Sequence, residues 1–186
     1  MGKEKKYSIT RQIFSMLTSH LSVCFITGFL SVMLLGISKY FIAKLLLCII
    51  CILIYFAWMF SSAYSLAESD NRSYTPLKPY PLKGLVLSIG VALIVGIMWV
   101  LYRLSWHYMP MHENVSIPTL IVMILYIYIT SPFTFLININ GEQANLIGQI
   151  ISVAVPVAIT FIGYYCGYKK IDLSKYTNKF VFEKKK

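Results

Sequence analysis

The sequence predicts an all-α, polytopic helical membrane protein, and three observations support this prediction. Of the 186 residues, 58% are hydrophobic and only 13% are charged. The apolar stretches approach the roughly 20 residues that a helix needs to cross a bilayer. Because lipid offers no hydrogen bonds to a polypeptide backbone, stretches of this kind span membranes as helices. Residues 1–186 are therefore expected to form a single integral membrane domain.

Five apolar segments follow one another, each bounded by charged or turn residues. The apolar part of the first is too long for a cleaved signal peptide, so this segment is expected to persist. Before the fourth, Ser116-Ile117-Pro118 suits a helix start, since proline is tolerated in the first turn. The five segments are 12–37, 41–66, 82–106, 119–137 and 146–168, with a polar connection at 67–81 and basic ends at 1–11 and 169–186.

The distribution of basic residues favours four complete crossings over five. Fourteen of the 17 lysines and arginines lie before the first segment, between Arg72 and Lys83, or after the last segment. If these three regions face the cytoplasm, three basic residues remain outside, as the positive-inside rule prefers. With five crossings, seven of the 17 basic residues would lie on one side of the membrane and ten on the other.

We therefore expect a cell-membrane protein with both ends in the cytoplasm. The segment 119–137 is then re-entrant or tilted and broken near Ser131-Pro132. Its apolar character leaves a fifth complete crossing open as the alternative.

The formal net charge of +10 predicts contact with anionic lipid headgroups. The electrostatic attraction to such a surface contributes about 1 kcal/mol of binding free energy for each nearby basic residue. No basic stripe interleaved with stacking aromatics is found outside the apolar segments, so nucleic acid is not expected as a partner.

Small residues at four-residue spacing predict helix-packing faces in two segments. In lipid, helices associate where small side chains let their backbones approach closely. We expect the third and last segments to pack together, or one of them to receive a membrane protein partner. The packing residues are Gly84, Ser88, Ala92 and Gly96 in the third segment, and Gly148, Ser152, Gly163 and Gly167 in the last.

Candidate ligand-binding residues are few. All carboxylates lie in tails, connections or span ends, which argues against an acidic proton or cation relay. His20 lies well inside the first segment, where it is expected to hydrogen-bond another helix, with proton transfer or ligand binding as the alternative. Pro132 and Pro156 interrupt helices near mid-membrane, where transporters often bind their substrates.

Two further motifs carry weaker hypotheses. Cys48 and Cys51 have the spacing of a redox pair, but they lack a cationic neighbour and a second cysteine pair, so a structural role is expected. The second motif is a cluster of two imidazoles and two thioethers, His107, Met109, Met111 and His112. Such soft ligands suit copper. We nevertheless interpret these four residues as interfacial side chains of the membrane protein. No metal or cofactor is expected.

Several short motifs resemble a known group of proteins. They are Asp70-Asn71-Arg72 with residues 80–84 opening a span, residues 125–128 with Ser131-Pro132-Phe133, and residues 163–171 closing a span before a lysine-rich tail. Together these motifs resemble a loosely defined group of small, uncharacterised multi-pass membrane proteins of Gram-positive bacteria. The resemblance implies a bacterial cell membrane and no assigned activity.

The sequence favours a non-enzymatic function. We find no phosphate-binding loop, dinucleotide-binding glycine pattern, nucleophile elbow or zinc-protease motif. The expected role is an accessory, assembly or regulatory subunit whose connection 70–83 and basic tail meet lipid headgroups or a cytoplasmic partner. A small transporter or substrate-capturing subunit is the alternative, and a membrane thiol oxidoreductase is the second alternative.

Overall fold

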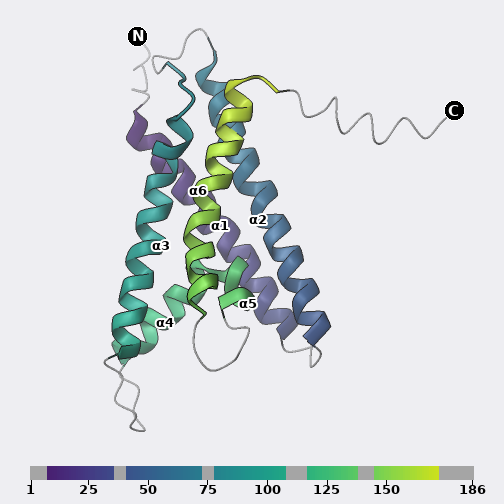
Figure 1. Cartoon of the computed structure of the whole chain (residues 1–186), viewed down its shortest axis with the longest axis vertical. Coiled ribbons are helices and arrows are strands. Elements are labelled where there is room, and N and C mark those ends of the chain that lie inside the picture. The colour runs from purple at the N-terminus through teal and green to yellow at the C-terminus, as the bar shows by residue number, and fades with distance from the viewer. Residues whose placement is uncertain (1–7, 36–40, 73–77, 108–116, 138–144, 172–186) are drawn as a thin grey trace, which may run out of the picture.

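The computed structural model describes residues 8–35, 41–72, 78–107, 117–137 and 145–171. Four long helices dominate it (Figure 1), and each is long and apolar enough to cross a membrane. They are α1 (Ile9–Leu35), α2 (Phe41–Asp70), α3 (Lys83–His107) and α6 (Leu146–Tyr168). The predicted fold class, a polytopic helical membrane protein, is confirmed.

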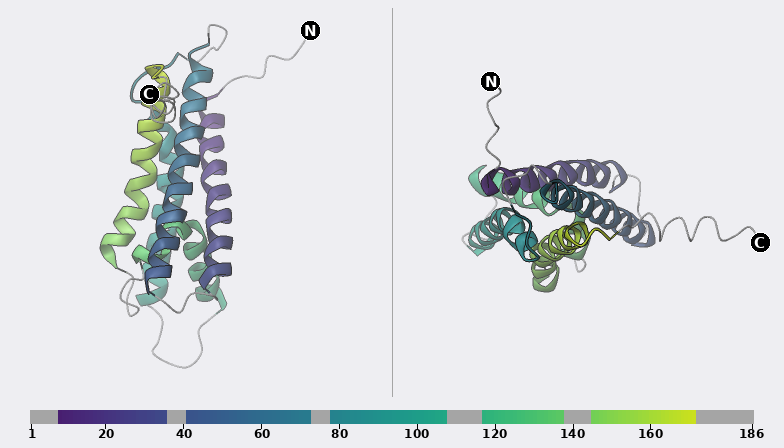
Figure 2. Two further views of the ribbon diagram at one scale, coloured as in Figure 1. Left: turned by 90° about the vertical axis from the view of Figure 1, so that its right-hand side faces the viewer. Right: turned by 90° about the horizontal axis from the view of Figure 1, so that it is seen from above.

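The four long helices form a ring in the order α1, α2, α6, α3 (Figure 2). They lie close together at the end where α1 begins and α6 ends, and they spread apart toward the opposite end (Figure 1). We call the first end the terminal face. The opposite end, which we call the hairpin face, is filled by three short elements: α4 (Ile117–Ile129), the 3₁₀ turn η1 (Ser131–Phe133) and α5 (Thr134–Ile137).

These short elements form a hairpin that enters and leaves at one side of the bundle. α4 runs inward along α1 and α3, η1 reverses the chain against α1 and α2, and α5 returns beside α6 (Figure 1). The backbone N–H of Asn145 donates to the carbonyl of Ile137 at 2.7 Å, so the end of the hairpin meets the start of α6. The favoured re-entrant arrangement of this segment is therefore the one observed.

Proline explains where the hairpin breaks. Pro132 has no backbone N–H and its ring clashes with a preceding carbonyl in a continuing α-helix. The Thr130 hydroxyl instead donates to the Tyr126 carbonyl at 2.8 Å, and the Phe133 N–H donates to the Thr130 carbonyl at 2.8 Å. Irregular backbone at membrane depth is tolerated only where protein or a water-filled cavity surrounds it, and the residues of η1 are all buried.

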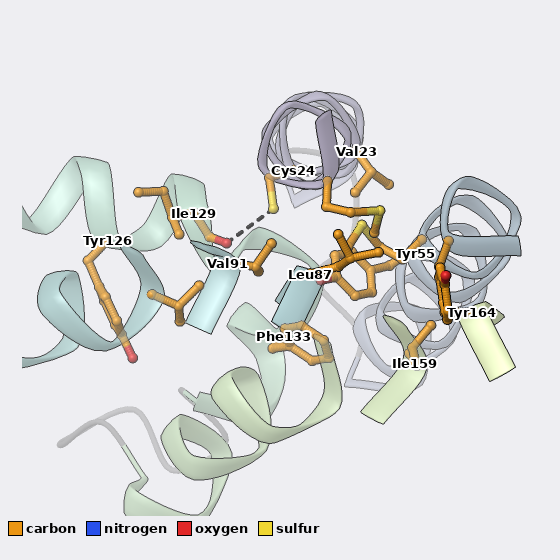
Figure 3. Close-up of a cluster of buried hydrophobic side chains, with 14 of the residues drawn as sticks. Val23, Cys24, Tyr55, Leu87, Val91, Tyr126, Ile129, Phe133, Ile159 and Tyr164 are labelled. Carbon is orange, nitrogen blue, oxygen red and sulfur yellow. Dashed lines mark hydrogen bonds between the residues drawn. The ribbon is translucent and has the colours of Figure 1, made fainter. Parts of the chain in front are cut away.

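The buried core joins the tip of the hairpin to the long helices (Figure 3). The rings of Tyr55 and Phe133 pack edge to face with their centroids 5.3 Å apart. The Cys24 thiol of α1 donates to the carbonyl of Ile129 at 3.1 Å, which is the dashed contact in Figure 3. Aromatic pairs and hydrogen bonds of this kind hold the hairpin against α1 and α2.

Helix ends differ from the predicted limits mainly at α2. This helix continues past Leu66 to Asp70, so the predicted polar connection at 67–81 begins inside it. α1 begins three residues early, at Ile9, where the carbonyl of Ser8 accepts the first helical hydrogen bonds. At α6 the limits agree, because the Asn145 side chain accepts from the N–H of Ile147 and caps the helix.

Candidate functional site

Four side chains meet at the terminal face and join all four long helices. The Asp70 carboxylate accepts from Lys83 Nζ at 2.6 Å and from the Tyr164 hydroxyl at 2.8 Å. Its second oxygen accepts from Gln12 Nε2 at 2.7 Å. We call this group the Asp70 cluster.

The Asp70 cluster is withdrawn from solvent. Asp70 is 2% exposed and Lys83 is 1% exposed. Removing two charges from water is costly, and their attraction compensates only if hydrogen bonds satisfy the remaining polar atoms. Gln12 and Tyr164 supply such bonds to the carboxylate. Because Asp70 is the last residue of α2 and Lys83 the first of α3, their ion pair also holds α2 beside α3.

A polar recess of about 350 Å³ lies next to this cluster, between the ends of α2 and α6. On its wall, Asn71 Nδ2 donates to the carbonyls of Gly167 and Tyr168 at 3.0 and 3.3 Å, so it caps the end of α6. The recess, which we call the α2/α6 recess, is lined by Tyr64, Glu68, Asn71, Arg72, Gly167 and Lys170. Its guanidinium and ammonium groups suit an anionic partner group, and Glu68 adds an acceptor.

Basic residues are unevenly divided between the two faces. Within the described ranges, six lie at or near the terminal face and two, Lys44 and Arg103, lie near the hairpin face. The terminal face is therefore the more positive end of the bundle, as its α2/α6 recess also indicates.

A second polar cluster surrounds the tip of the hairpin. His20 Nδ1 and the Tyr55 hydroxyl are hydrogen-bonded at 2.9 Å. The Ser131 hydroxyl donates to the Cys24 carbonyl at 2.7 Å and lies 2.9 Å from the hydroxyl of Thr27. Cys24 is roughly 22 Å from the start of α1 and roughly 16 Å from its end. This hairpin-tip cluster therefore lies near the middle of the bundle.

Comparisons with protein-family models, with curated proteins and with solved structures find no match to the chain. The resemblance to small multi-pass proteins of Gram-positive bacteria consequently stays a prediction. The geometry of the bundle itself is then the basis for any functional proposal.

The structure places two of the three candidate ligand residues, His20 and Pro132, at the hairpin tip. His20 is buried and contacts Tyr55, which packs on Phe133 directly after Pro132. Pro156 is buried within α6. The expected interhelical hydrogen bond of His20 is present, and its partner is the hydroxyl of Tyr55 on α2.

The predicted packing residues serve several different interfaces. A Cβ on Gly84 would lie 2.8 Å from the Phe161 backbone, so α3 and α6 approach closely there. Gly163 and Gly167 instead face α2, where a Cβ would lie 2.8 and 2.7 Å from the carbonyl oxygens of Phe60 and Tyr64. The glycine pair near the end of α6 is thus an α2 contact, which sequence spacing did not reveal.

The other packing candidates divide between the core and a lipid-facing surface. Gly148 abuts the backbone of Leu136 in α5. Ser88 and Ser152 are buried and donate to carbonyls one turn back, while Ala92 is half-buried. A Cβ on Gly96 would meet no described atom within 4 Å. The last of the four small residues predicted for packing in α3 therefore faces open space.

The weaker chemical candidates have little support from the geometry. Cys48 and Cys51 are free thiols that are only 6% and 2% exposed, and thiol exchange requires access for the attacking partner. His107 ends α3. The other members of the metal hypothesis, Met109, Met111 and His112, lie outside the described residues.

Sequence reasoning missed the Asp70 cluster. Asp70 and Lys83 are predicted at the ends of a polar connection that meets lipid headgroups or a cytoplasmic partner, and the sequence assigns no role to Gln12 or Tyr164. The available signal was a carboxylate and an ammonium group at two facing span ends. It was insufficient because their pairing depends on how α2 and α3 are rotated about their axes.

Proposed function

We propose that this protein is a non-enzymatic, multi-pass accessory subunit of a bacterial cell membrane, and that it binds a partner through its terminal face. The observation that carries the proposal is the α2/α6 recess, which displays Arg72, Lys170 and Glu68 beside the Asp70 cluster. Charged and polar groups on a rigid support suit specific recognition of another protein.

The interior of the bundle supports a structural rather than a catalytic role. Asp70 is bonded to groups from the other three long helices, and Ser131 is bonded to Cys24 and Thr27. Hydrogen bonds that join several helices restrict the movement of these helices relative to one another. A rigid bundle of this kind presents its terminal face in one defined shape.

The charge distribution supports cytoplasmic ends. Basic residues are retained on the cytoplasmic side of membranes, and an anionic leaflet attracts them. With the terminal face in the cytoplasm, Arg11, Lys169 and Lys170 lie near lipid headgroups. The same orientation presents the α2/α6 recess to a cytoplasmic or membrane protein partner.

Affinity purification from native membranes tests this proposal. We expect the wild-type protein to recover one partner at constant stoichiometry. The double variant Arg72→Glu/Lys170→Glu should lose that partner, because it reverses the charge of the α2/α6 recess. Lys44→Glu, a charge reversal near the hairpin face, is the matched control and should retain it. Recovery of the same proteins by all three would overturn the proposal.

A second candidate function is capture of a small substrate at the hairpin-tip cluster. Its favouring observation is that His20 and Tyr55 meet a broken segment near mid-membrane, as at many transporter sites. A thermal-shift screen of amino acids, vitamins and metal ions should then identify a ligand whose effect is lost in Tyr55→Phe. Absence of any response in the wild-type protein would count against this candidate.

A further inference from the structure

An apolar groove of about 510 Å³ separates α3 from α6 in the half of the bundle near the hairpin face. Gly96 and Trp99 form its α3 side, and Val153, Ala154 and Val157 lie on its α6 side. Its depth depends on Gly96, where an added Cβ would meet no described atom within 4 Å. We call it the α3/α6 groove.

One fully buried polar side chain lines this groove. Gln149 is 0% exposed, and its Oε1 accepts from Trp99 Nε1 at 2.8 Å and from Arg103 Nε at 3.1 Å. Both partners are donors only, so the orientation of the amide is determined. Its Nε2 has no hydrogen-bond partner among the described residues. The amide therefore offers N–H donors in an apolar groove, and leaving buried donors unpaired is unfavourable.

Arg103 adds a charge next to Gln149, to which it is hydrogen-bonded. Arg103 lies one turn before the end of α3, and Gln149 lies one turn after the start of α6. Both are thus close to the hairpin face. Gly96 lies roughly 10 Å deeper along α3. Near the face, a cation and an amide donor therefore lie side by side, and deeper in the groove the walls are apolar.

We propose that the α3/α6 groove is a binding site for one glycerophospholipid from the leaflet at the hairpin face. The phosphate lies against the guanidinium of Arg103, and an ester carbonyl accepts from Gln149 Nε2. One acyl chain lies along Gly96 and Val153. Polar groups near the interface and apolar walls deeper in the groove match the phosphate and ester of a glycerophospholipid and the hydrocarbon that follows them inward.

A neighbouring groove accommodates the second acyl chain. It has a volume of about 440 Å³ and shares Gly96 and Trp99 with the first. Its other walls are apolar side chains of α3, including Ala92, Leu93 and Val100. The two grooves thus meet at Gly96 and Trp99, which suits a lipid with two chains.

A second copy of the chain fits this groove less well than a lipid. A membrane helix seated on Gly96 would present apolar side chains, because its backbone carbonyls are already bonded within the helix. The donors of Gln149 would remain unpaired. An ester carbonyl pairs with them, and a phosphate matches the charge of Arg103.

Native mass spectrometry of the full chain in detergent, titrated with phosphatidylglycerol, tests the proposal. We expect one tightly bound lipid on the wild-type protein. Gly96→Phe should abolish this adduct by filling the groove. Arg103→Gln should weaken it by about tenfold, as expected for loss of one charge-assisted hydrogen bond. Leu53→Phe, at a lipid-exposed position of α2, is the matched control and should bind as the wild-type protein does.

The variants distinguish a specific lipid site from a lipid annulus and from a dimer interface. Equal adducts on all four proteins would show a non-specific annulus and overturn the proposal. A dimer mass that disappears in Gly96→Phe, without a lipid adduct, would assign the groove to a second copy and also overturn it. Arg103→Gln changes a solvent-exposed side chain, so it remains informative if Gly96→Phe fails to fold.

Discussion

At the scale of single residues, Asp70 is the side chain through which all four long helices are joined. Its carboxylate accepts bonds from Lys83, Tyr164 and Gln12 and is itself buried. A buried ion pair contributes little net stability when both charges are present, whereas removing one partner leaves a buried charge without compensation. The sequence showed Asp70 and Lys83 at two span ends but not their contact.

We therefore predict that Asp70→Leu lowers the free energy of unfolding by about 3–5 kcal/mol. The double variant Asp70→Leu/Lys83→Leu should recover most of this loss, because neither charge is then buried. Equilibrium unfolding in mixed detergent and SDS micelles measures both values. Glu68→Gln, at an exposed carboxylate of the same helix, is the control and should change little. A double variant as unstable as the single one would contradict the interpretation.

Ser131 is the second residue with a specific expected effect, because its hydroxyl bonds α1 from the hairpin tip. We predict that Ser131→Ala lowers the free energy of unfolding by about 1 kcal/mol, the scale of interhelical hydrogen bonds in membranes. It should also speed amide hydrogen exchange in α4. Thr18→Val removes an exposed hydroxyl bonded only within α1, so this control should leave exchange in α4 unchanged.

At the scale of elements, helix α6 is held by backbone contact with three neighbours. Gly84 brings α3 against it, Gly163 and Gly167 bring it against α2, and Gly148 brings it against α5. The four-residue spacing predicted that these positions pack. It could not say which helix each one contacts, because the small residues of α6 lie along one side of the helix and meet different neighbours at its two ends.

We predict that Gly163→Ala and Gly167→Ala each lower the free energy of unfolding by about 1–3 kcal/mol, the usual cost of overpacking. The reason is the short distance that each new Cβ would have to α2 backbone. Gly96→Ala is the matched control, and its stability should stay equal or rise, because alanine favours helix more than glycine. The same unfolding assay compares all three. An equal loss in Gly96→Ala would show that the losses do not come from the close approach of Gly163 and Gly167 to α2.

The hairpin is the element that sequence reasoning anticipated best. Its start at Ile117 and its break at Ser131-Pro132 agree with the expectation, because proline acts locally on the backbone. Its support by Cys24 and Thr27 was not anticipated, since those contacts join residues far apart in the chain.

At the scale of the whole molecule, four spans place the start of α1 and the end of α6 at one end of the bundle. The basic residues gather at the same end. This agreement between charge and topology supports cytoplasmic ends, although the orientation in a membrane stays a prediction of the positive-inside rule.

Cysteine accessibility checks this orientation. In a cysteine-free background, we expect single cysteines at Gly141 and His112 to react with an impermeant reagent added outside intact cells. Cysteines at Tyr74 and Phe180 should react only after the membrane is opened. Labelling of positions 112 and 141 from the same side supports the four-span arrangement, and labelling of these two positions from opposite sides would require a fifth crossing.

The sequence by itself determined the helical membrane class, and it favoured four long spans with an interrupted hairpin over five complete crossings. These features follow from apolar length, charge placement and proline, which act on each segment separately. Only the tertiary structure decided that Asp70 binds Lys83, that Gly163 and Gly167 face α2, and that Gln149 lines a groove beside Gly96. Such contacts depend on the order and rotation of the helices, and lipid is equally compatible with many rotations of one apolar helix.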